Sequence, residues 1–217
     1  MKKRIAIFAS GTGSNLENIL RRIQQGQLPC ACSLVFSDRP GAPCLEKARN
    51  YPVEQVVSFA PKAFFDKMAY ETRLMDLVES LEIDYIVLAG YMRILSPRFV
   101  RRFPWRIVNI HPALLPSFKG AHAIHDAFQA RVEKTGVTVH FVTEEVDGGP
   151  LILQEEVWLE PEDTVERLEK KIHAVEHELY PKALHLLLND QVEVDPQTNR
   201  VRLLDKPRNA SVPEKKE

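Results

Sequence analysis

The chain has 217 residues, a formal net charge of −1 and 44% hydrophobic residues, as expected of a soluble α/β protein with an ordinary core. The near-neutral charge argues against a nucleic-acid coat protein. No apolar run approaches the roughly 20 residues that span a bilayer. A basic start, residues 1–4, precedes an apolar run that is too short for a signal peptide. We therefore expect a cytoplasmic protein.

The first predicted element is a strand over residues 3–9, followed by the glycine-containing loop 10–15 and a helix. The helix is predicted from apolar residues at the spacing i, i+3, i+4 and i+7: Leu16, Ile19, Leu20 and Ile23. Ser14 and Glu17 have the spacing of a capping box. A strand, a glycine loop and a helix start can bind phosphate. A tight turn without a ligand is the alternative. The loop lacks the Gly-Lys-Ser/Thr ending of a P-loop and a full G-x-G-x-x-G pattern.

Strands and helices continue to alternate along the first half of the chain. Further strands are predicted at 32–36, 53–57 and 84–89, and helices at 45–50 and 61–81. This order predicts an α/β fold with a mainly parallel twisted sheet and helices on both faces. Ligands of such sheets bind beyond the carboxyl ends of the strands. The three cysteines, Cys30, Cys32 and Cys44, lack a second Cys pair, so we expect reduced thiols and no metal site.

The second half of the chain predicts mixed strands and one long helix. Strands are expected at 106–111, 137–142 and 151–157, and helices at 122–132 and 163–188. Asp163 and Glu166 form a predicted capping pair, and Pro181 should kink or divide the long helix. We expect one domain over 1–190, a hairpin over 191–206 and a disordered tail over 207–217.

Asn109 and His111 lie two residues apart at the end of a predicted strand and therefore point the same way. An amide and an imidazole there can hold an oxygen that gains negative charge. Asp147, between two later strands, is the best-placed carboxylate to orient the imidazole. Together these three residues favour acyl-type transfer without a covalent nucleophile. The alternative is a strand-end histidine whose hydrogen bonds are satisfied, and a plain Asp-Gly-Gly turn.

Three further features carry two interpretations each. The loop 90–95 either packs its apolar side chains under the next helix or forms a wall for a flat, partly apolar ligand. Glu176 either faces solvent or contacts a ligand amine. His140, between Val139 and Phe141, is predicted to be structural.

Five segments in order resemble the folate-dependent formyltransferases. They read GTGSNL (11–16), YMRIL (91–95), NIHPALLPSFKG (109–120), GVTVHFV (136–142) and VDGGPLILQ (146–154). The resemblance covers about residues 5–187, nearly the whole chain apart from the tail. It implies a Rossmann-like formyltransferase fold.

The resemblance also implies an activity. A formyl group would pass from 10-formyltetrahydrofolate, as cosubstrate, to the amine of glycinamide ribonucleotide in purine synthesis. The amine would attack directly through a tetrahedral intermediate, without a metal or an acyl-enzyme. The expected partners are these two small molecules, with no nucleic acid and no membrane, and the protein would be a monomer or homodimer.

Matching positions receive roles from the same resemblance. Asn109 and His111 would stabilise the oxyanion, and Asp147 would pair with His111 and order a water for proton transfer. The implied ribonucleotide contacts are Gly13, Ser14, Asn15 and Glu176. The implied folate contacts are Lys62, Met92, Arg93, Ile94, Leu95 and Asn109. One departure is Ala113, where the family commonly has serine.

Other activities share parts of this pattern. A formyltetrahydrofolate hydrolase would transfer the formyl group to water, and is expected to have a further N-terminal segment. Formyltransferases for methionyl-tRNA and for sugar nucleotides are expected to have further domains. A non-catalytic phosphosugar-binding protein would keep the glycine loop, but the presence of Asn109, His111 and Asp147 argues against it.

Overall fold

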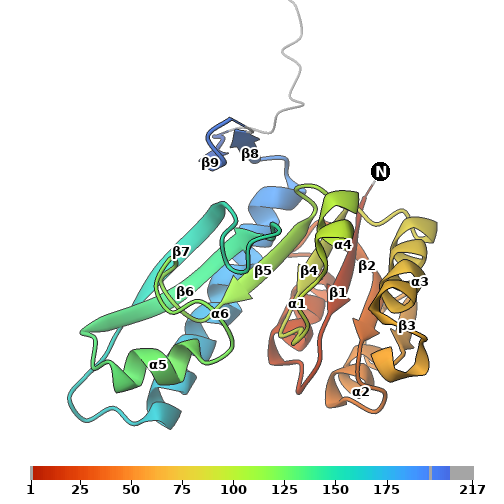
Figure 1. Ribbon diagram of the computed structural model, residues 1–217. Coiled ribbons are helices and arrows are strands. Elements are labelled where there is room, and N and C mark those ends of the chain that lie inside the picture. Colours follow the sequence, from red (N-terminus) through yellow and green to blue (C-terminus); the bar gives the residue numbers. More distant parts are fainter. Residues whose placement is uncertain (1, 196, 206–217) are drawn as a thin grey trace, which may run out of the picture.

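The computed structural model describes residues 2–195 and 197–205, and its centre is a seven-stranded sheet (Figure 1). The strand order is β3-β2-β1-β4-β5-β6-β7. The first five strands pair in parallel, whereas β6 and β7 are antiparallel. Their bounds are β1 Lys3–Phe8, β2 Cys30–Ser37, β3 Gln55–Ser58, β4 Tyr85–Leu88, β5 Ile107–His111, β6 Lys134–Phe141 and β7 Leu151–Trp158. The predicted mainly parallel sheet with mixed strands in the C-terminal half is confirmed.

Helices cover both faces of the sheet. One face packs against α1 (Ser14–Gln24), α2 (Pro43–Arg49), α5 (Ala123–Gln129) and α6 (Val165–Leu188). The other face packs against α3 (Lys67–Ser80) and α4 (Pro97–Arg102).

The central strand β1 explains why the sheet has two apolar faces. Ile5 and Ile7 point into one core, Ala6 and Phe8 point into the other, and all four are 0% exposed. A strand buried on both faces reads as a continuous apolar run rather than as an alternation.

The single helix expected over residues 61–81 is wrong. The structure has a short 3-10 helix, η1 (Pro61–Ala63), and then α3 from Lys67. Phe64 adopts an extended conformation that ends the first turn. Asp66 then caps α3 by accepting a hydrogen bond from the Ala69 N–H at 2.7 Å. A new N-cap within the predicted helix therefore separates the two segments.

Both predicted capping pairs are wrong. The N-cap of α1 is Gly13, in the left-handed region at φ +74°, so that Ser14 is already helical. Glu17 instead pairs with Lys47 of α2 at 2.6 Å. At the start of α6 the cap is Thr164, whose hydroxyl accepts from the Arg167 N–H at 3.3 Å.

Pro181 lies inside α6 and does not divide it, since the helix runs from Val165 to Leu188. Proline has no N–H, so the carbonyl of residue i−4, His177, loses its helical donor. This carbonyl accepts hydrogen bonds from α1 instead, from Asn18 Nδ2 at 2.6 Å and from Arg22 at 3.4 Å.

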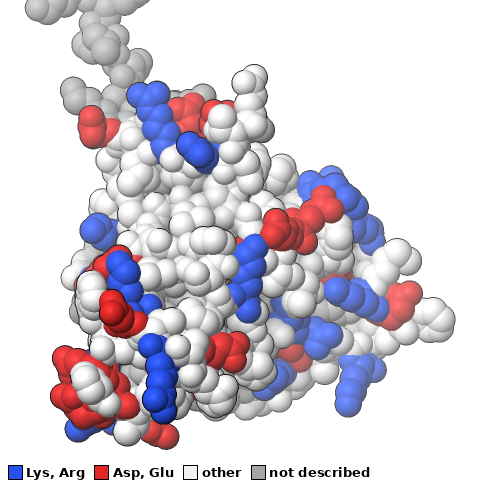
Figure 2. Space-filling model, turned by 60° about the vertical axis from the view of Figure 1, so that its left-hand side comes forward, with Lys and Arg blue, Asp and Glu red and all other residues white. Residues whose placement is uncertain are grey.

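After α6, the predicted hairpin strands pair as β8 (Val192–Asp195) and β9 (Arg200–Leu203). The tail predicted over 207–217 lies outside the described residues. Within the described part of the chain, no helix is long and apolar enough to cross a membrane. On the face shown in Figure 2, positive and negative side chains are interspersed, apart from an acidic group at the lower left.

Candidate functional site

The polar residues that the sequence singled out meet where β1, β4 and β5 end. Asn109 and His111 lie on β5, and β6 runs antiparallel beside it. In this register Asn109 is directly opposite His140. Residues two apart on a strand share a face, so Asn109, His111 and His140 project to the same side of the sheet.

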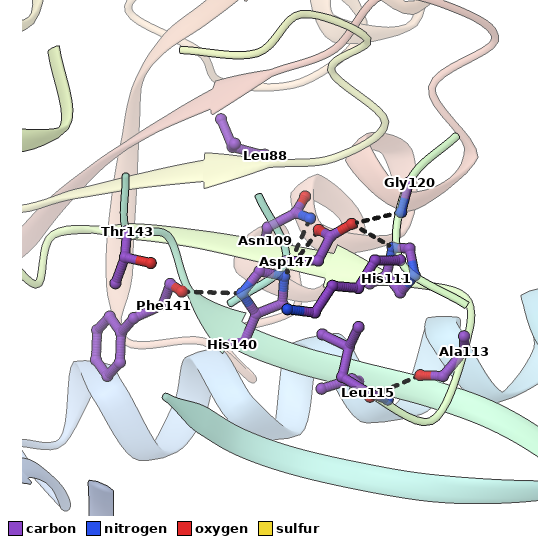
Figure 3. Close-up of polar contacts among 12 residues, drawn as sticks. Leu88, Asn109, His111, Ala113, Leu115, Gly120, His140, Phe141, Thr143 and Asp147 are labelled. Atoms are coloured by element: carbon purple, nitrogen blue, oxygen red, sulfur yellow. Dashed lines mark hydrogen bonds and ion pairs between the residues drawn. The ribbon is translucent and has the colours of Figure 1, made fainter. Parts of the chain in front are cut away.

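Asp147 completes this cluster from the turn after β6 (Figure 3). Its Oδ2 lies 3.5 Å from His111 Nδ1 and accepts the Gly120 N–H at 2.9 Å. Its Oδ1 lies 3.6 Å from His140 Nε2. The Asp147 backbone is left-handed, at φ +49°, and Gly149 follows where a Cβ would lie 1.9 Å from the Phe141 carbonyl oxygen. The tight turn therefore directs the carboxylate between the two imidazoles.

Burial alone would raise the pKa of Asp147, but the contacts with His140, the Gly120 N–H and His111 hold that pKa below its usual value. The group is therefore a carboxylate at neutral pH. A buried anion between two imidazoles stabilises positive charge on either ring.

In each histidine, the ring nitrogen that does not face Asp147 lies within hydrogen-bond distance of a backbone carbonyl oxygen. His111 Nε2 lies 2.8 Å from the Phe118 carbonyl oxygen, and His140 Nδ1 lies 2.8 Å from the Phe141 carbonyl oxygen. Both His111 nitrogens thus face oxygen acceptors, which hold the orientation of the ring. His140 Nε2 also lies 3.3 Å from Asn109 Nδ2. An amide nitrogen has two hydrogens, so Asn109 keeps a second donor for another group.

The glycine loop lies beside this cluster and is shaped by Gly13. Its left-handed conformation turns the chain into α1, and a Cβ there would lie 2.6 Å from Cys44 Cβ. The Cys44 N–H donates to the Gly11 carbonyl at 3.1 Å, so α2 supports the loop from behind. The N–H groups of the first turn of α1 have no acceptor within the helix and are free for an anion.

Glu176 lies at the same end of the sheet, contrary to the solvated interpretation. It is 6% exposed and accepts a hydrogen bond from Asn15 Nδ2 at 2.9 Å. Burial raises the pKa of Glu176, although the Asn15 hydrogen bond and the nearby His173 oppose the shift. Asn15 Oδ1 is buried without a protein partner among the described residues. The pair therefore offers a carboxylate and an amide oxygen to a donor such as an amine.

Residues 92–95, in the loop between β4 and α4, comprise three exposed residues and one buried residue. Met92 and Ile94 are each 67% exposed, Arg93 is also exposed, and Leu95 is 8% exposed. The Ile94 carbonyl accepts a hydrogen bond from Lys67 Nζ at 3.0 Å. We call residues 92–95 the Met92–Leu95 loop. Exposed apolar side chains on an anchored backbone suit a flat, partly apolar ligand.

Lys62, the basic residue singled out from the sequence, lies in η1. Lys67 is the lysine that contacts the Met92–Leu95 loop. Ala113 is 0% exposed, and its carbonyl accepts from Thr138 Oγ1 at 2.6 Å. The Thr138 hydroxyl of β6 thus forms a hydrogen bond at position 113, where the family commonly has serine.

Sequence reasoning missed three buried polar residues. His140 was assigned a structural role, although it is 2% exposed beside Asp147. The alternation of β6 was visible, but the register that sets His140 opposite Asn109 was not. Ser10 and Asp38, at the ends of β1 and β2, are 1% and 5% exposed. Their position at strand ends was the only available signal.

Comparisons with known proteins show the family of this chain. The sequence model described as formyl transferase matches residues 3–184. The chain belongs to the formyl transferase family. No group of three or more His, Cys, Asp and Glu side chains in the described ranges could hold a metal ion.

Individual relatives extend over most of this formyltransferase. Phosphoribosylglycinamide formyltransferase of Bacillus subtilis is 38% identical over 86% of this chain and 95% of the relative. The crystal structure of glycinamide ribonucleotide transformylase 1 from Symbiobacterium toebii has a TM-score of 0.89 and 40% identity, covering 94% of both chains. A formyltetrahydrofolate deformylase from Pseudomonas syringae has a TM-score of 0.83 and 32% identity, covering 94% of this chain and 67% of the other.

Proposed function

We propose that this formyltransferase transfers the formyl group of 10-formyltetrahydrofolate to the amine of glycinamide ribonucleotide, in purine synthesis. The observation that carries the proposal is that the Asn109–His111–Asp147 cluster, the glycine loop and the Met92–Leu95 loop lie at the ends of the neighbouring strands β5, β1 and β4. The names and high coverage of the relatives support the same reaction. We further infer that the enzyme works in the cytoplasm as a monomer or homodimer, without nucleic-acid or membrane partners.

In the proposed reaction the ribonucleotide amine attacks the formyl carbon. The nitrogen–carbon bond forms as the carbonyl oxygen gains charge, and collapse of the tetrahedral intermediate breaks the bond to N10 of the folate. The amine gives up a proton and the folate nitrogen takes one. An α-amine has a pKa of about 8, so a useful neutral fraction exists near pH 7 without a strong base.

The protein's part is to hold the oxyanion and move the proton. The second N–H of Asn109 donates to the developing oxygen, and His111 joins it when its Nε2–H turns to that oxygen from the Phe118 carbonyl. Asp147 keeps His111 oriented, and orders the water that carries the proton. His140 Nε2 accepts one hydrogen of the Asn109 amide and so holds this amide in place.

Binding is divided between two loops. The N–H groups at Gly13, Ser14 and Asn15 take the ribonucleotide phosphate, and Glu176 takes a donor of its glycinamide part. Met92, Arg93, Ile94 and Leu95 line the pterin of the folate, whose formyl end reaches Asn109. The family resemblance offers Lys62 as the residue that binds the anionic folate tail. We expect Lys67 to contribute more of this binding energy, because its Nζ already donates to the Ile94 carbonyl of the Met92–Leu95 loop.

A second candidate is hydrolysis of the formyl folate, favoured by the structural similarity to the deformylase. Both activities are tested by incubating purified protein with 10-formyltetrahydrofolate, with and without glycinamide ribonucleotide. Formylated ribonucleotide and tetrahydrofolate formed only in the complete mixture would support the transferase. Formate released without the ribonucleotide would overturn it in favour of the hydrolase. Ribonucleotide binding without turnover would indicate a non-catalytic binder.

A further inference from the structure

Ser10 joins the two proposed binding loops through its backbone and its side chain. It follows β1 and is the first residue of the glycine loop (residues 10–15). Its N–H donates to the Gly90 carbonyl at 3.0 Å, and its Oγ accepts the Met92 N–H at 2.9 Å. The residue that begins the glycine loop therefore holds the backbone of the Met92–Leu95 loop.

Asp38, at the end of the neighbouring strand β2, fixes the direction of this hydroxyl. Its Oδ1 accepts a hydrogen bond from Ser10 Oγ at 2.5 Å. A carboxylate only accepts and a backbone N–H only donates, so the single Ser10 hydrogen is directed to Asp38 and a lone pair faces Met92. The other oxygen, Oδ2, lies 3.9 Å from the Arg93 guanidinium. Asp38 thus reaches the same loop a second way.

Burying Asp38 is unfavourable unless its charge is compensated. The residue is 5% exposed, and a buried carboxylate loses hydration that one hydroxyl and a distant guanidinium only partly replace. Nearby Tyr70 and Tyr91 share a hydrogen bond of 2.7 Å between their hydroxyls, and burial raises the pKa of Tyr70 to about 12. These phenols therefore stay neutral. A buried serine–aspartate pair is thus unfavourable for stability by itself, which favours a role of Ser10 and Asp38 in positioning the Met92–Leu95 loop.

We propose that Ser10 and Asp38 are positioning residues that couple ribonucleotide binding to folate binding. The inference rests on the proposed function. A phosphate bound by the glycine loop restrains the chain at residues 11–15 and hence Ser10. Through the Met92 N–H, this restraint fixes the backbone that the pterin meets. Because coupling is reciprocal, bound folate must tighten ribonucleotide binding by the same factor.

The test is calorimetric titration of tetrahydrofolate into the full-length protein, with and without saturating glycinamide ribonucleotide. Tetrahydrofolate has no formyl group, so both ligands bind without turnover. The ratio of the two Kd values is the coupling factor, expected to be about fivefold or more in the wild type. Ser10→Ala removes both hydrogen bonds of the hydroxyl, the one to Asp38 and the one from the Met92 N–H. It should weaken tetrahydrofolate binding about 2- to 10-fold and bring the coupling factor close to one.

Asp38→Asn is the conservative variant. Its amide oxygen can still accept from Ser10, while the charge facing Arg93 is lost, so the coupling factor should lie between those of the wild type and Ser10→Ala. Ser10→Ala should also raise the KM of the formyl folate while kcat stays within about twofold, because the lost hydrogen bond to the Met92 N–H is made in the ground state as well. A purely structural role of Ser10 would not change the coupling factor and the KM while leaving kcat nearly unchanged.

Two matched controls remove comparable hydrogen bonds elsewhere. Ser80→Ala loses a bond to the Leu77 carbonyl at the end of α3, and Asp84→Asn changes the acceptor of the Arg4 N–H at the opposite end of the sheet. Both should keep the wild-type coupling factor. A wild-type factor of one, an unchanged factor in Ser10→Ala, or equal losses in the controls would overturn the inference.

The proposed function can fail separately. If the wild type binds both ligands cooperatively but transfers no formyl group, the coupling stands and the catalytic proposal falls. If the wild type binds neither ligand, both fall.

Discussion

The two ends of the central sheet differ in how far their polar side chains are exposed to solvent. At the amino ends of the parallel strands, Arg4 pairs with Glu54 at 2.7 Å, with side chains 34% and 49% exposed. At the carboxyl ends, His111, His140 and Glu176 are 4%, 2% and 6% exposed. Exposed ion pairs contribute little to stability, whereas buried polar groups lose hydration. The difference indicates that burial of polar side chains, rather than the number of charges, marks the end of the sheet where we propose that the reaction takes place.

The largest expected effect is at the buried end, where Asn109→Ala removes one donor to the developing oxyanion. We expect kcat to fall on the order of 10²–10³-fold, while the Kd of the ribonucleotide changes little. Steady-state kinetics with both substrates check this prediction. Asn189→Ala, which removes a side-chain hydrogen bond to His185 at the end of α6, should leave kcat unchanged. A main effect on the ribonucleotide KM would contradict the role of Asn109.

The next largest effect is expected from Gly13→Ala, beside the same cluster. The left-handed backbone and the approach of a Cβ to Cys44 should destabilise the fold by about 2 kcal/mol or more. Thermal unfolding measures this loss, and ribonucleotide binding should weaken as well. Gly26→Ala is the matched control, because Gly26 has φ +73° but open space around its Cβ position. Equal effects of the two variants would show that the contact with Cys44 is unimportant.

A smaller effect, dependent on pH, is expected from Glu176→Gln. Burial raises the pKa of Glu176, so its favourable contribution is complete below the usual glutamate pKa and is lost as pH rises through the raised value. The variant does not ionise and should gain Tm relative to the wild type as pH increases, while binding the ribonucleotide less well. Melting curves across pH 4–8 test this. The exposed Glu46→Gln should show no such trend, and a pH-independent difference for Glu176→Gln would refute the prediction.

The smallest effect is expected at the exposed end. Glu54→Gln breaks the pair with Arg4 and should change stability by at most about 1 kcal/mol, with no effect on kcat. Chemical denaturation and the formyl-transfer assay measure both quantities. A loss well above this range would remove the contrast between the two ends of the sheet.

The sequence predicted the order of strands and helices well, because β1 and β5 are apolar and end at Gly or Pro signals. It also placed Asn109 and His111 on one face, since that needs only the period of a strand. The pairing of His111 with Asp147 was proposed from the place of Asp147 between two later strands, and the family resemblance implied the same pairing. Its distance could not be predicted, because 36 positions along the chain and the register of the strands separate the two residues.

Local chemistry misled the prediction where tertiary contacts decide. Ser14 and Glu17 have capping spacing, yet Lys47 of another helix takes the glutamate. His140 was predicted to be structural, because the residues next to it in the sequence do not reveal the antiparallel register that sets it opposite Asn109. The solvated interpretation of Glu176 failed for a similar reason, since its partner Asn15 lies on another helix, 161 positions away.

Pro181 shows how a missing hydrogen bond within one helix can allow a hydrogen bond to another helix. The carbonyl that it leaves open in α6 belongs to His177, next to Glu176, and Asn18 of α1 occupies it. One turn before Asn18, Asn15 reaches Glu176. Two side chains on one face of α1, Asn15 and Asn18, thus form hydrogen bonds to the adjacent residues Glu176 and His177 of α6. Pro181→Ala would offer the His177 carbonyl a competing N–H from within α6. The spacing of the Asn15–Glu176 pair would then depend on one hydrogen bond between the helices in place of two.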